Sequence, residues 1–501
     1  MAPHLLLALL SAVGQPAAEA QVVPYGAPHM GPASEAFSVR VNGQPVYTQR
    51  FMSYAYAHFA FAGQVRVEVT FREPITAGVA VTPSKYGIQP SVDGRTLAFS
   101  LDQPRKLFLR VNLPAAYNYW SRRCDQHFLV LFAEALETGA PQVGQTGVVS
   151  LLDHGADASG ERDSAPALRA ALAACPQGGT VYVPDGRYRL DSPVKLDRPG
   201  LTLYLAGNAL LWRPAAPDGL LVAADDLTLR GRGTIEAASY ALRTASGRQA
   251  VHRVKIEDLV LRDSYISREG EYHMIARFTL DDFVIRGVKG LGCPQNETYG
   301  KQRDGLALDD STRGVVEDCF VWSGDDAFYV WSWESPSAHI VVRNCAFRAE
   351  GGASAMKDMS QHLIEDLQFL DCVSLRGALQ IDCRIPRGKQ PPTPFGSQRG
   401  IVFRNIDIEE LAHVGIAAFF GTQLMDADCQ AVLDNVRFIG FYPGRNQFIV
   451  RGTDRVQVAF RRLQVGNQVV ASRDDVARVG FQPTWEGAAH ISFSAEQGAQ
   501  P

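Results

Sequence analysis

Two patterns of apolar and polar positions divide this 501-residue chain into two parts. Between residues 36 and 137, short stretches alternate apolar and polar residues, and turn sequences such as Asn42-Gly43 and Asp93-Gly94 separate them. No helical period intervenes. Short alternating strands at this spacing predict a β-sandwich domain. The segment 139–147, with Pro141 and three glycines, predicts a linker after it.

A repeat replaces this pattern from about residue 200. A strand that ends in Gly, Asp or Asn, followed by a small or apolar residue, recurs every 24 to 34 residues, at Gly207, Gly231, Asp263, Gly287, Asp318, Asn344, Asp371, Asn405 and Asn435. One coil of a parallel β-helix uses about this many residues. The chain is therefore predicted to be all-β, with a right-handed parallel β-helix over 147–490. A helix over 163–174 is expected to cover its open apolar end.

The start of the chain and its charge bear on where the protein works. The apolar stretch 4–13, followed by Ala18-Glu-Ala20, resembles a secretory signal peptide, so residues 1–20 are predicted to be one and the protein to be secreted or periplasmic. A disordered or helical N-terminus is the alternative. A net charge of −4 gives no indication of nucleic acid or anionic membrane as a partner. No later apolar run is long enough to cross a bilayer.

Eight cysteines are present, without the spacing of a metal site. Cys319, Cys345 and Cys372 follow one another at intervals of 26 and 27 residues. This period favours thiols that stack inside the solenoid over a disulfide framework. No metal ligand set and no phosphate loop is recognisable, so no metal and no cofactor is expected.

The candidate chemistry lies in Asp304-Gly-Leu-Ala-Leu308 and Asp325-Asp-Ala-Phe-Tyr-Val330. If these apolar runs are successive rungs of one sheet, Asp304 and Asp326 lie about one strand spacing (~4.8 Å) apart, with Asp325 beside them. Crowded carboxylates repel each other, so folding alone does not favour the cluster. Hydrolysis of a glycoside needs a protonated acid and an ionised base, and crowding separates their pKa values. A role of these residues in turns is the structural alternative.

A substrate groove is expected on the same sheet. The aligned rungs place Lys357, Asp382 and Arg384 on its outer face, with Trp331 and Tyr299 close by. Aromatic faces stack on pyranose rings, and charged groups bond sugar hydroxyls. The pattern predicts a long open groove for a polysaccharide or oligosaccharide, in which Lys357 serves either as a substrate ligand or as a counter-ion of the acids.

These motifs carry a family resemblance. The stretch 147–190, which includes Gly178-Gly-Thr-Val-Tyr-Val-Pro-Asp-Gly186, resembles the first coils of the pectate-lyase-like β-helix superfamily. The acid motifs resemble those of glycoside hydrolase family 28 (polygalacturonases) and family 49 (dextranases and isopullulanases), and the preceding sandwich favours family 49. The resemblance implies that Asp325 is the general acid and that Asp304 and Asp326 position and activate water in an inverting hydrolysis.

The chain departs from the polygalacturonase pattern in two places. Residues 351–357 lack the Gly-His-Gly motif of that family, and Arg384-Ile-Pro-Arg387 replaces its Arg-Ile-Lys. Three carboxylates would also repel a uronate polymer. We therefore expect an endo-acting inverting hydrolase of a neutral α-glucan such as dextran or pullulan. A polygalacturonase-like hydrolase or a lyase acting on uronate polymers, and a non-catalytic glycan-binding protein, remain the alternatives.

Overall fold

The computed structural model describes residues 20–52, 54–112, 127–245, 249–263, 273–292, 303–350, 354–383, 396–411, 416–420, 428–440 and 446–496. Two of the predicted site residues, Tyr299 and Arg384, lie outside the described residues, as does nearly all of the predicted signal peptide. Neither described α-helix is long and apolar enough to cross a membrane.

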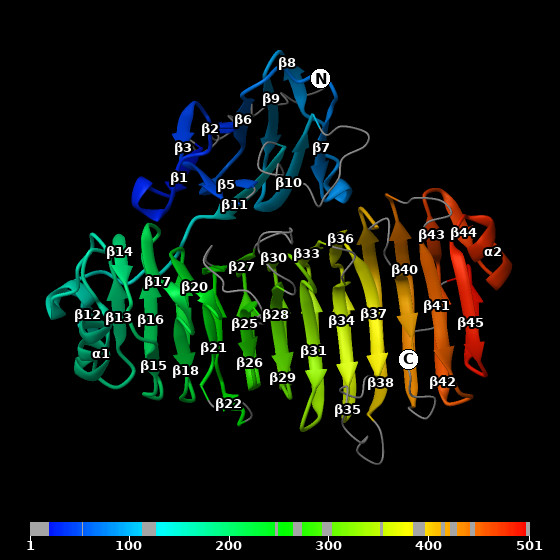
Figure 1. Ribbon diagram of the computed structural model, residues 1–501. Helices are drawn as coiled ribbons and strands as arrows, with labels where there is room; N and C mark the ends of the chain where they lie inside the picture. Colours follow the sequence, from blue (N-terminus) through cyan, green and yellow to red (C-terminus); the bar gives the residue numbers. More distant parts are fainter. Residues whose placement is uncertain are drawn as a thin grey trace, which may run out of the picture.

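Two sheets form the N-terminal part of the chain (Figure 1). One has the order β1 (Gln21–Tyr25), β5 (Tyr54–Ala62), β11 (Phe128–Ala135), β10 (Arg105–Val111) and β7 (Val79–Thr82), with β4 (Thr48–Phe51) also paired to β5. The other has the order β3 (Gln44–Val46), β2 (Phe37–Val41), β6 (Val65–Phe71), β9 (Thr96–Leu101) and β8 (Ser91–Asp93). The inner faces of both sheets share one apolar core. Since β1 pairs with β5, the sheets begin upstream of residue 36.

The second part is a parallel β-helix, as predicted (Figure 1). Its larger sheet has 24 strands, from β12 (Val148–Ser150) to β46 (His490–Ser494). The smaller sheet, called the site sheet below, consists of β15 (Val194–Leu196), β18 (Leu220–Val222), β21 (Leu242–Thr244), β25 (His273–Phe278), β28 (Arg303–Asp309), β31 (Phe328–Ser332), β34 (Ser354–Ser360), β37 (Ala378–Cys383), β39 (Ile416–Phe420), β41 (Gln447–Gly452) and β45 (Gln482–Gly487).

The repeated Gly, Asp and Asn residues mostly mark a corner between two strands of a coil. Six of them have a left-handed backbone with φ between 51° and 64°: Gly287, Asp318, Asn344, Asp371, Asn405 and Asn435. Asp and Asn tolerate this conformation better than other non-glycine residues. Their side chains also bond between coils, since Asn435 Nδ2 donates to Asn405 Oδ1 at 2.8 Å. Asp263 also ends a strand, β24 (Val260–Asp263), but the left-handed corner of its coil lies at Asp258 (φ 64°).

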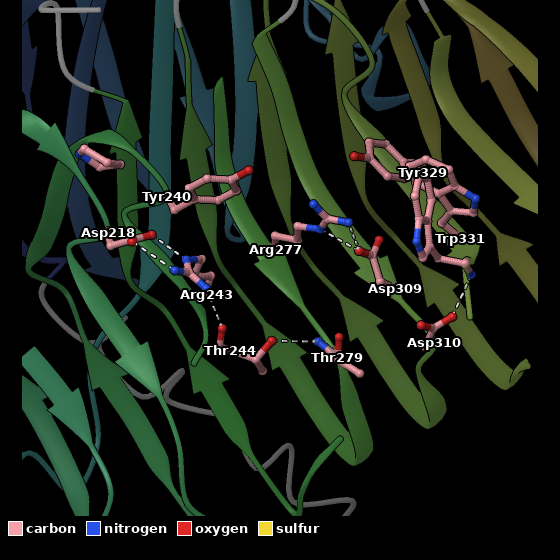
Figure 2. Close-up of a pocket in the computed structure, with 12 residues that line it drawn as sticks. Asp218, Tyr240, Arg243, Thr244, Arg277, Thr279, Asp309, Asp310, Tyr329 and Trp331 are labelled. Atoms are coloured by element: carbon pink, nitrogen blue, oxygen red, sulfur yellow. Dashed lines mark hydrogen bonds and ion pairs between the residues drawn. The ribbon is translucent and has the colours of Figure 1, made fainter. Parts of the chain in front are cut away.

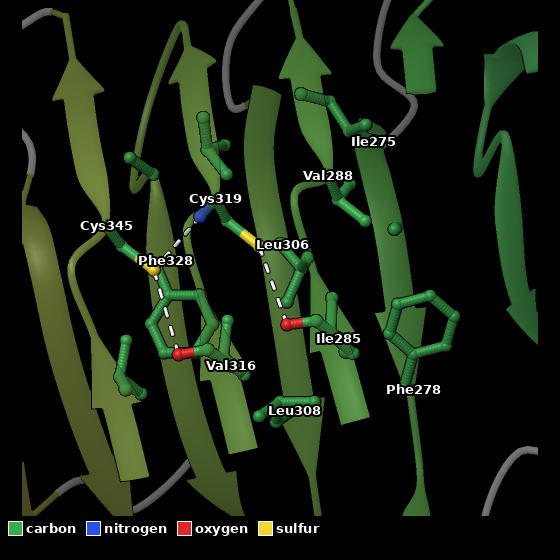
Figure 3. Close-up of a cluster of buried hydrophobic side chains, with 14 of the residues drawn as sticks. Ile275, Phe278, Ile285, Val288, Leu306, Leu308, Val316, Cys319, Phe328 and Cys345 are labelled. Carbon is green, nitrogen blue, oxygen red and sulfur yellow. Dashed lines mark hydrogen bonds between the residues drawn. The ribbon is translucent and has the colours of Figure 1, made fainter. Parts of the chain in front are cut away.

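The coil interior is apolar from end to end. Helix α1 (Ala165–Ala174) buries Leu168 and Leu172 against the first coils, which matches the predicted capping helix. The thiols of Cys319 and Cys345 stack inside, where the backbone N–H of Cys319 donates to Cys345 Sγ at 3.4 Å (Figure 3). Burial raises the pKa of the Cys345 thiol well above its usual value. These thiols therefore act as small apolar side chains.

A buried interface joins the sandwich to the coils that carry the acids and to the coils on either side of them. Tyr54 of β5 stacks on Trp322 of β30 (Phe320–Ser323), with ring centroids 3.8 Å apart and planes 19° apart. The guanidinium group of Arg348 lies 4.4 Å from the ring centroid of Phe108. Strand β30 leads directly into the Asp325-Asp326 segment. The sandwich thus packs on the strand that positions two of the three acids.

Candidate active site

The structure brings the three predicted acids together on the site sheet. Asp304 lies at the start of β28, and Asp325 and Asp326 lie just before β31. One carboxylate oxygen from each residue can be chosen so that all three lie within 4.8 Å of one another. Asp304 is 4% exposed, whereas the other two are partly exposed. A buried acid beside two accessible ones is an arrangement that can separate their protonation states.

Backbone pairing between the two rungs explains why the acids meet. Leu306 lies opposite Phe328, and the N–H of Gly305 donates to the carbonyl oxygen of Asp326 at 2.8 Å. This register sets Asp304 beside Asp326. A Cβ atom at residue 305 would lie 2.1 Å from the carbonyl oxygen of Ala327, so only glycine allows the two strands to approach. The Asp-Gly sequence is therefore required by the geometry of the rung.

Asp326 is held by two groups from the next coil. Lys357 Nζ lies 2.7 Å from its Oδ2, and the backbone N–H of Ser354 donates to its Oδ1 at 2.9 Å. The side chains of Lys357 and Asp326 are only 5% and 14% exposed. Of the two roles considered for Lys357, the observed contact is that of a counter-ion. An ammonium group at this distance stabilises an ionised carboxylate.

A chain of hydrogen bonds continues from this pair into the following coil. The hydroxyl of Ser354 donates to Gln380 Oε1 at 2.7 Å, and Gln380 Nε2 donates to Asp382 Oδ2 at 3.2 Å. Asp382 is fully buried, which disagrees with its expected place on an open groove. Sequence reasoning missed Ser354 and Gln380, although both are polar residues in the rungs that it aligned.

A further buried aspartate, Asp358, contacts this series of hydrogen bonds through the backbone of Asp382. Asp358 is fully buried, and its Oδ1 accepts from Gln398 Nε2 at 2.6 Å and from the backbone N–H of Asp382 at 3.3 Å. Burial raises the pKa of Asp358 well above its ordinary value. Its neutral form therefore belongs to the framework that fixes β34 and β37, and not to the acid cluster.

A groove of about 710 Å³ opens on the same sheet and runs from the residues before β18 and β21 to the ends of β28 and β31 (Figure 2). It is lined by aromatic side chains and by two arginine–aspartate pairs: Pro217, Asp218, Tyr240, Arg243, Thr244, Arg277, Thr279, Asp309, Asp310, Tyr329, Trp331 and Trp333. Of the predicted substrate residues, Trp331 lies here. Its ring packs edge-on against Trp333, with centroids 4.0 Å apart.

Comparisons with known proteins agree with this architecture. Residues 148–377 match the family model described as rhamnogalacturonase A/epimerase, pectate lyase-like. Over these residues the β-helix is similar to a pectate-lyase-like domain. All three acids and Lys357 fall within the matched residues, and the predicted resemblance to this superfamily is confirmed.

Two curated relatives each match about two fifths of the chain. Probable rhamnogalacturonase B of Neosartorya fischeri is 27% identical over 219 residues, which cover 40% of this chain and 39% of the relative. Rhamnogalacturonase A of Aspergillus aculeatus is 24% identical over 239 residues, which cover 43% of this chain and 49% of the relative. The chain thus spans between two fifths and half of the length of these relatives.

A solved structure extends the likeness to both parts of the chain. Dex49A from Penicillium minioluteum aligns with a TM-score of 0.55 at 11% sequence identity, covering 92% of this chain and 95% of that one. At this identity the likeness concerns the fold. The arrangement of a β-sandwich followed by a parallel β-helix therefore recurs in another protein.

Proposed function

We propose that this protein is a glycoside hydrolase that cleaves a polysaccharide at Asp304, Asp325 and Asp326. The observation that carries the proposal is the convergence of these carboxylates within 4.8 Å on the outer face of the site sheet, with a cation beside one of them. Like charges so close are unfavourable for folding, and acid–base catalysis gives a reason for them. The names of the relatives, all rhamnogalacturonases, support the same class of reaction.

The surroundings of the acids favour different roles for them. Asp326, whose Oδ2 lies 2.7 Å from Lys357 Nζ, is proposed as the base that takes a proton from water. Asp325, partly exposed and on the same turn, is proposed as the acid that protonates the glycosidic oxygen. The water oxygen then bonds to the anomeric carbon as the bond to the leaving oxygen breaks. Asp304 completes the water-binding set.

The stereochemical outcome is proposed to be inversion, on the family resemblance. The separation of the acids is shorter than the roughly 6.5–9.5 Å usual for inverting enzymes, so spacing does not support this part of the proposal. Proton NMR of the first product formed distinguishes the two outcomes, because inversion and retention release opposite anomers.

Two substrate classes are proposed. The family model that covers the acids and the names of the relatives favour a polymer of rhamnose and galacturonate. A neutral α-glucan such as dextran or pullulan is the second candidate, supported by the groove on the site sheet, whose described lining residues include three aspartates and only two arginines. The apolar N-terminal stretch supports a secreted or periplasmic enzyme, which mass spectrometry tests by looking for a mature chain that begins at Gln21.

A reducing-end assay over rhamnogalacturonan, polygalacturonate, dextran and pullulan tests the function. We expect new reducing ends from at least one polymer, unchanged by EDTA, and none from the Asp325→Asn variant. Unsaturated products whose formation stops in EDTA would identify a lyase. Tight binding of a glycan without any turnover would identify a binding protein.

A further inference from the structure

The described residues that line the groove of Figure 2 do not include the three acids, although both groups lie on the site sheet. Asp304 and Asp309 mark the two ends of β28, so they are roughly 17 Å apart along the strand. An apolar cluster connects these ends, because Tyr329 and Met274 pack together and the Tyr329 hydroxyl lies 3.6 Å from Met274 Sδ. That span is longer than one sugar unit. A polysaccharide bound at the acids can therefore reach the groove with a more distant unit.

Charges in the groove are balanced in pairs. Arg277 Nε donates to Asp309 Oδ2 at 2.5 Å, and Arg243 Nη2 donates to Asp218 Oδ2 at 2.9 Å (Figure 2). Asp310 accepts the backbone N–H of Trp333 at 2.6 Å. Among the described residues that line the groove, each guanidinium group has its own carboxylate, and one further carboxylate is present. No positive charge is left over to attract a uronate.

Two polar atoms in the wall of the groove lack a partner. Within the described part of the chain, neither Asp309 Oδ1 nor Trp331 Nε1 has a hydrogen bond, and the Asp309 side chain is only 5% exposed. These two residues lie directly opposite each other on β28 and β31. A buried polar atom without a partner is unfavourable for the folded state. Arg277 contacts only Oδ2, through Nε and Nη2, so a ligand that reaches Oδ1 does not have to displace the arginine.

The chemistry of these atoms selects the ligand. Asp309 Oδ1 needs a donor, and Trp331 Nε1 needs an acceptor. A sugar hydroxyl supplies both, whereas a uronate carboxylate supplies no donor and is repelled by Asp309. We propose that this groove is a subsite for a neutral pyranose unit, which stacks on Trp331 and whose hydroxyls bond Asp309. The proposal rests on the proposed function, since it takes this unit to be part of the polysaccharide substrate.

Binding to the full-length Asp325→Asn protein tests the subsite by calorimetry. The probes are isomaltohexaose, maltohexaose, a rhamnogalacturonan hexasaccharide and hexagalacturonate. We expect at least one probe with neutral units to bind, Trp331→Leu to weaken it roughly tenfold, and Trp331→Phe to retain most of the affinity. Trp212→Leu is the matched control, because Trp212 is half-buried on β17 (Ala209–Pro217), outside the site sheet. The Trp212→Leu variant should bind each probe with the same affinity as the parent protein.

The subsite is overturned if hexagalacturonate is the only ligand, or if folded Trp331→Leu binds every probe as tightly as the parent does. Should Trp331→Leu not fold, Trp333→Leu takes its place with the same expectation.

The subsite and the hydrolase function can be disproved independently of each other. If Trp331→Leu weakens binding but the parent enzyme hydrolyses no polymer, the hydrolase is wrong and the subsite stands. If hydrolysis occurs and the KM of Trp331→Leu is unchanged for chains of every length, the subsite is wrong.

Discussion

The ammonium group of Lys357 lies 2.7 Å from a carboxylate oxygen of Asp326, one coil away. Both side chains are largely buried, so solvent screens this pair weakly. The cation offsets part of the repulsion among the three acids, and it fixes the direction of the Asp326 carboxylate. The Lys357–Asp326 pair is therefore expected to affect both the stability of the coil and the proposed hydrolysis.

Replacing Lys357 by Met should lower both activity and stability. The variant leaves Asp326 without its cation in a largely buried place, which costs about 3 kcal/mol or more, and a misdirected carboxylate lowers turnover roughly 10²-fold. Steady-state kinetics and thermal unfolding measure the two effects. Lys357→Arg, which keeps the charge, should recover part of both. Full activity of a folded Lys357→Met protein would contradict a role of this cation in the reaction.

Asp325→Asn should abolish most turnover and leave the fold intact. The change is isosteric at a partly exposed position, and loss of a general acid costs a factor of roughly 10² or more. The matched control is Asp226→Asn, because Asp226 is an exposed turn residue with φ 59° that Asn tolerates. Rates of the folded variant close to those of the control would remove Asp325 from the acid role.

The fold and the acid cluster could be predicted because both follow from a repeat. The repeat of 24 to 34 residues predicts the coils of the β-helix. The spacing between neighbouring strands then predicts that Asp304 lies close to Asp326, and neither step depends on side-chain packing. The repeat could not show that Asp263 lies outside the corner of its coil. In sequence it resembles the other corner residues, but Asp258 makes the turn, and Asp263 ends β24 (Val260–Asp263) in an ion pair with Arg303 at 2.6 Å.

The substrate residues were harder to predict than the acids, because a groove depends on which side chains are covered. Asp382 faces the same side as Trp331 in the register of the sheet, yet it is fully buried. Arg243 and Arg277 carry no motif, and their strands precede the acid motifs in the chain, so nothing in the sequence connects them to the site. The choice between counter-ion and ligand for Lys357 required the observed distance to Asp326.

Trp322→Ala should destabilise the coils at the interface with the sandwich. Trp322 is fully buried and stacks on Tyr54, so its truncation is expected to cost roughly 3–5 kcal/mol. Thermal unfolding followed by circular dichroism measures the loss. Trp322→Phe should cost less, and Trp212→Ala, at a half-buried position, should cost less still. An unfolding midpoint unchanged in Trp322→Ala would mean that the interface contributes nothing to the stability of the coils.

The same interface should make the protein less stable below neutral pH. His58 Nε2 lies 2.7 Å from Glu134 Oε2, and Lys289 Nζ lies 2.9 Å from Glu134 Oε1, all in the buried contact between β11 and the coils. Burial is the largest cause that lowers the pKa of His58, from 6.5 to about 4, and the neighbouring Lys289 adds to it. The imidazole is therefore neutral in the folded protein at pH 5.

The unfolded chain binds a proton at His58 below pH 6.5, whereas the folded protein does so only near pH 4. Stability is therefore fully present above pH 6.5 and is lost as the pH falls toward 4, by about 2 kcal/mol at pH 5. His58→Gln keeps an N–H donor but removes this titration, so its unfolding midpoint should fall less between pH 7 and pH 5 than that of the parent. His490→Gln, at an exposed histidine, is the control and should keep the parental pH dependence. Equal slopes for His58→Gln and the parent would show that protonation of His58 is not linked to unfolding.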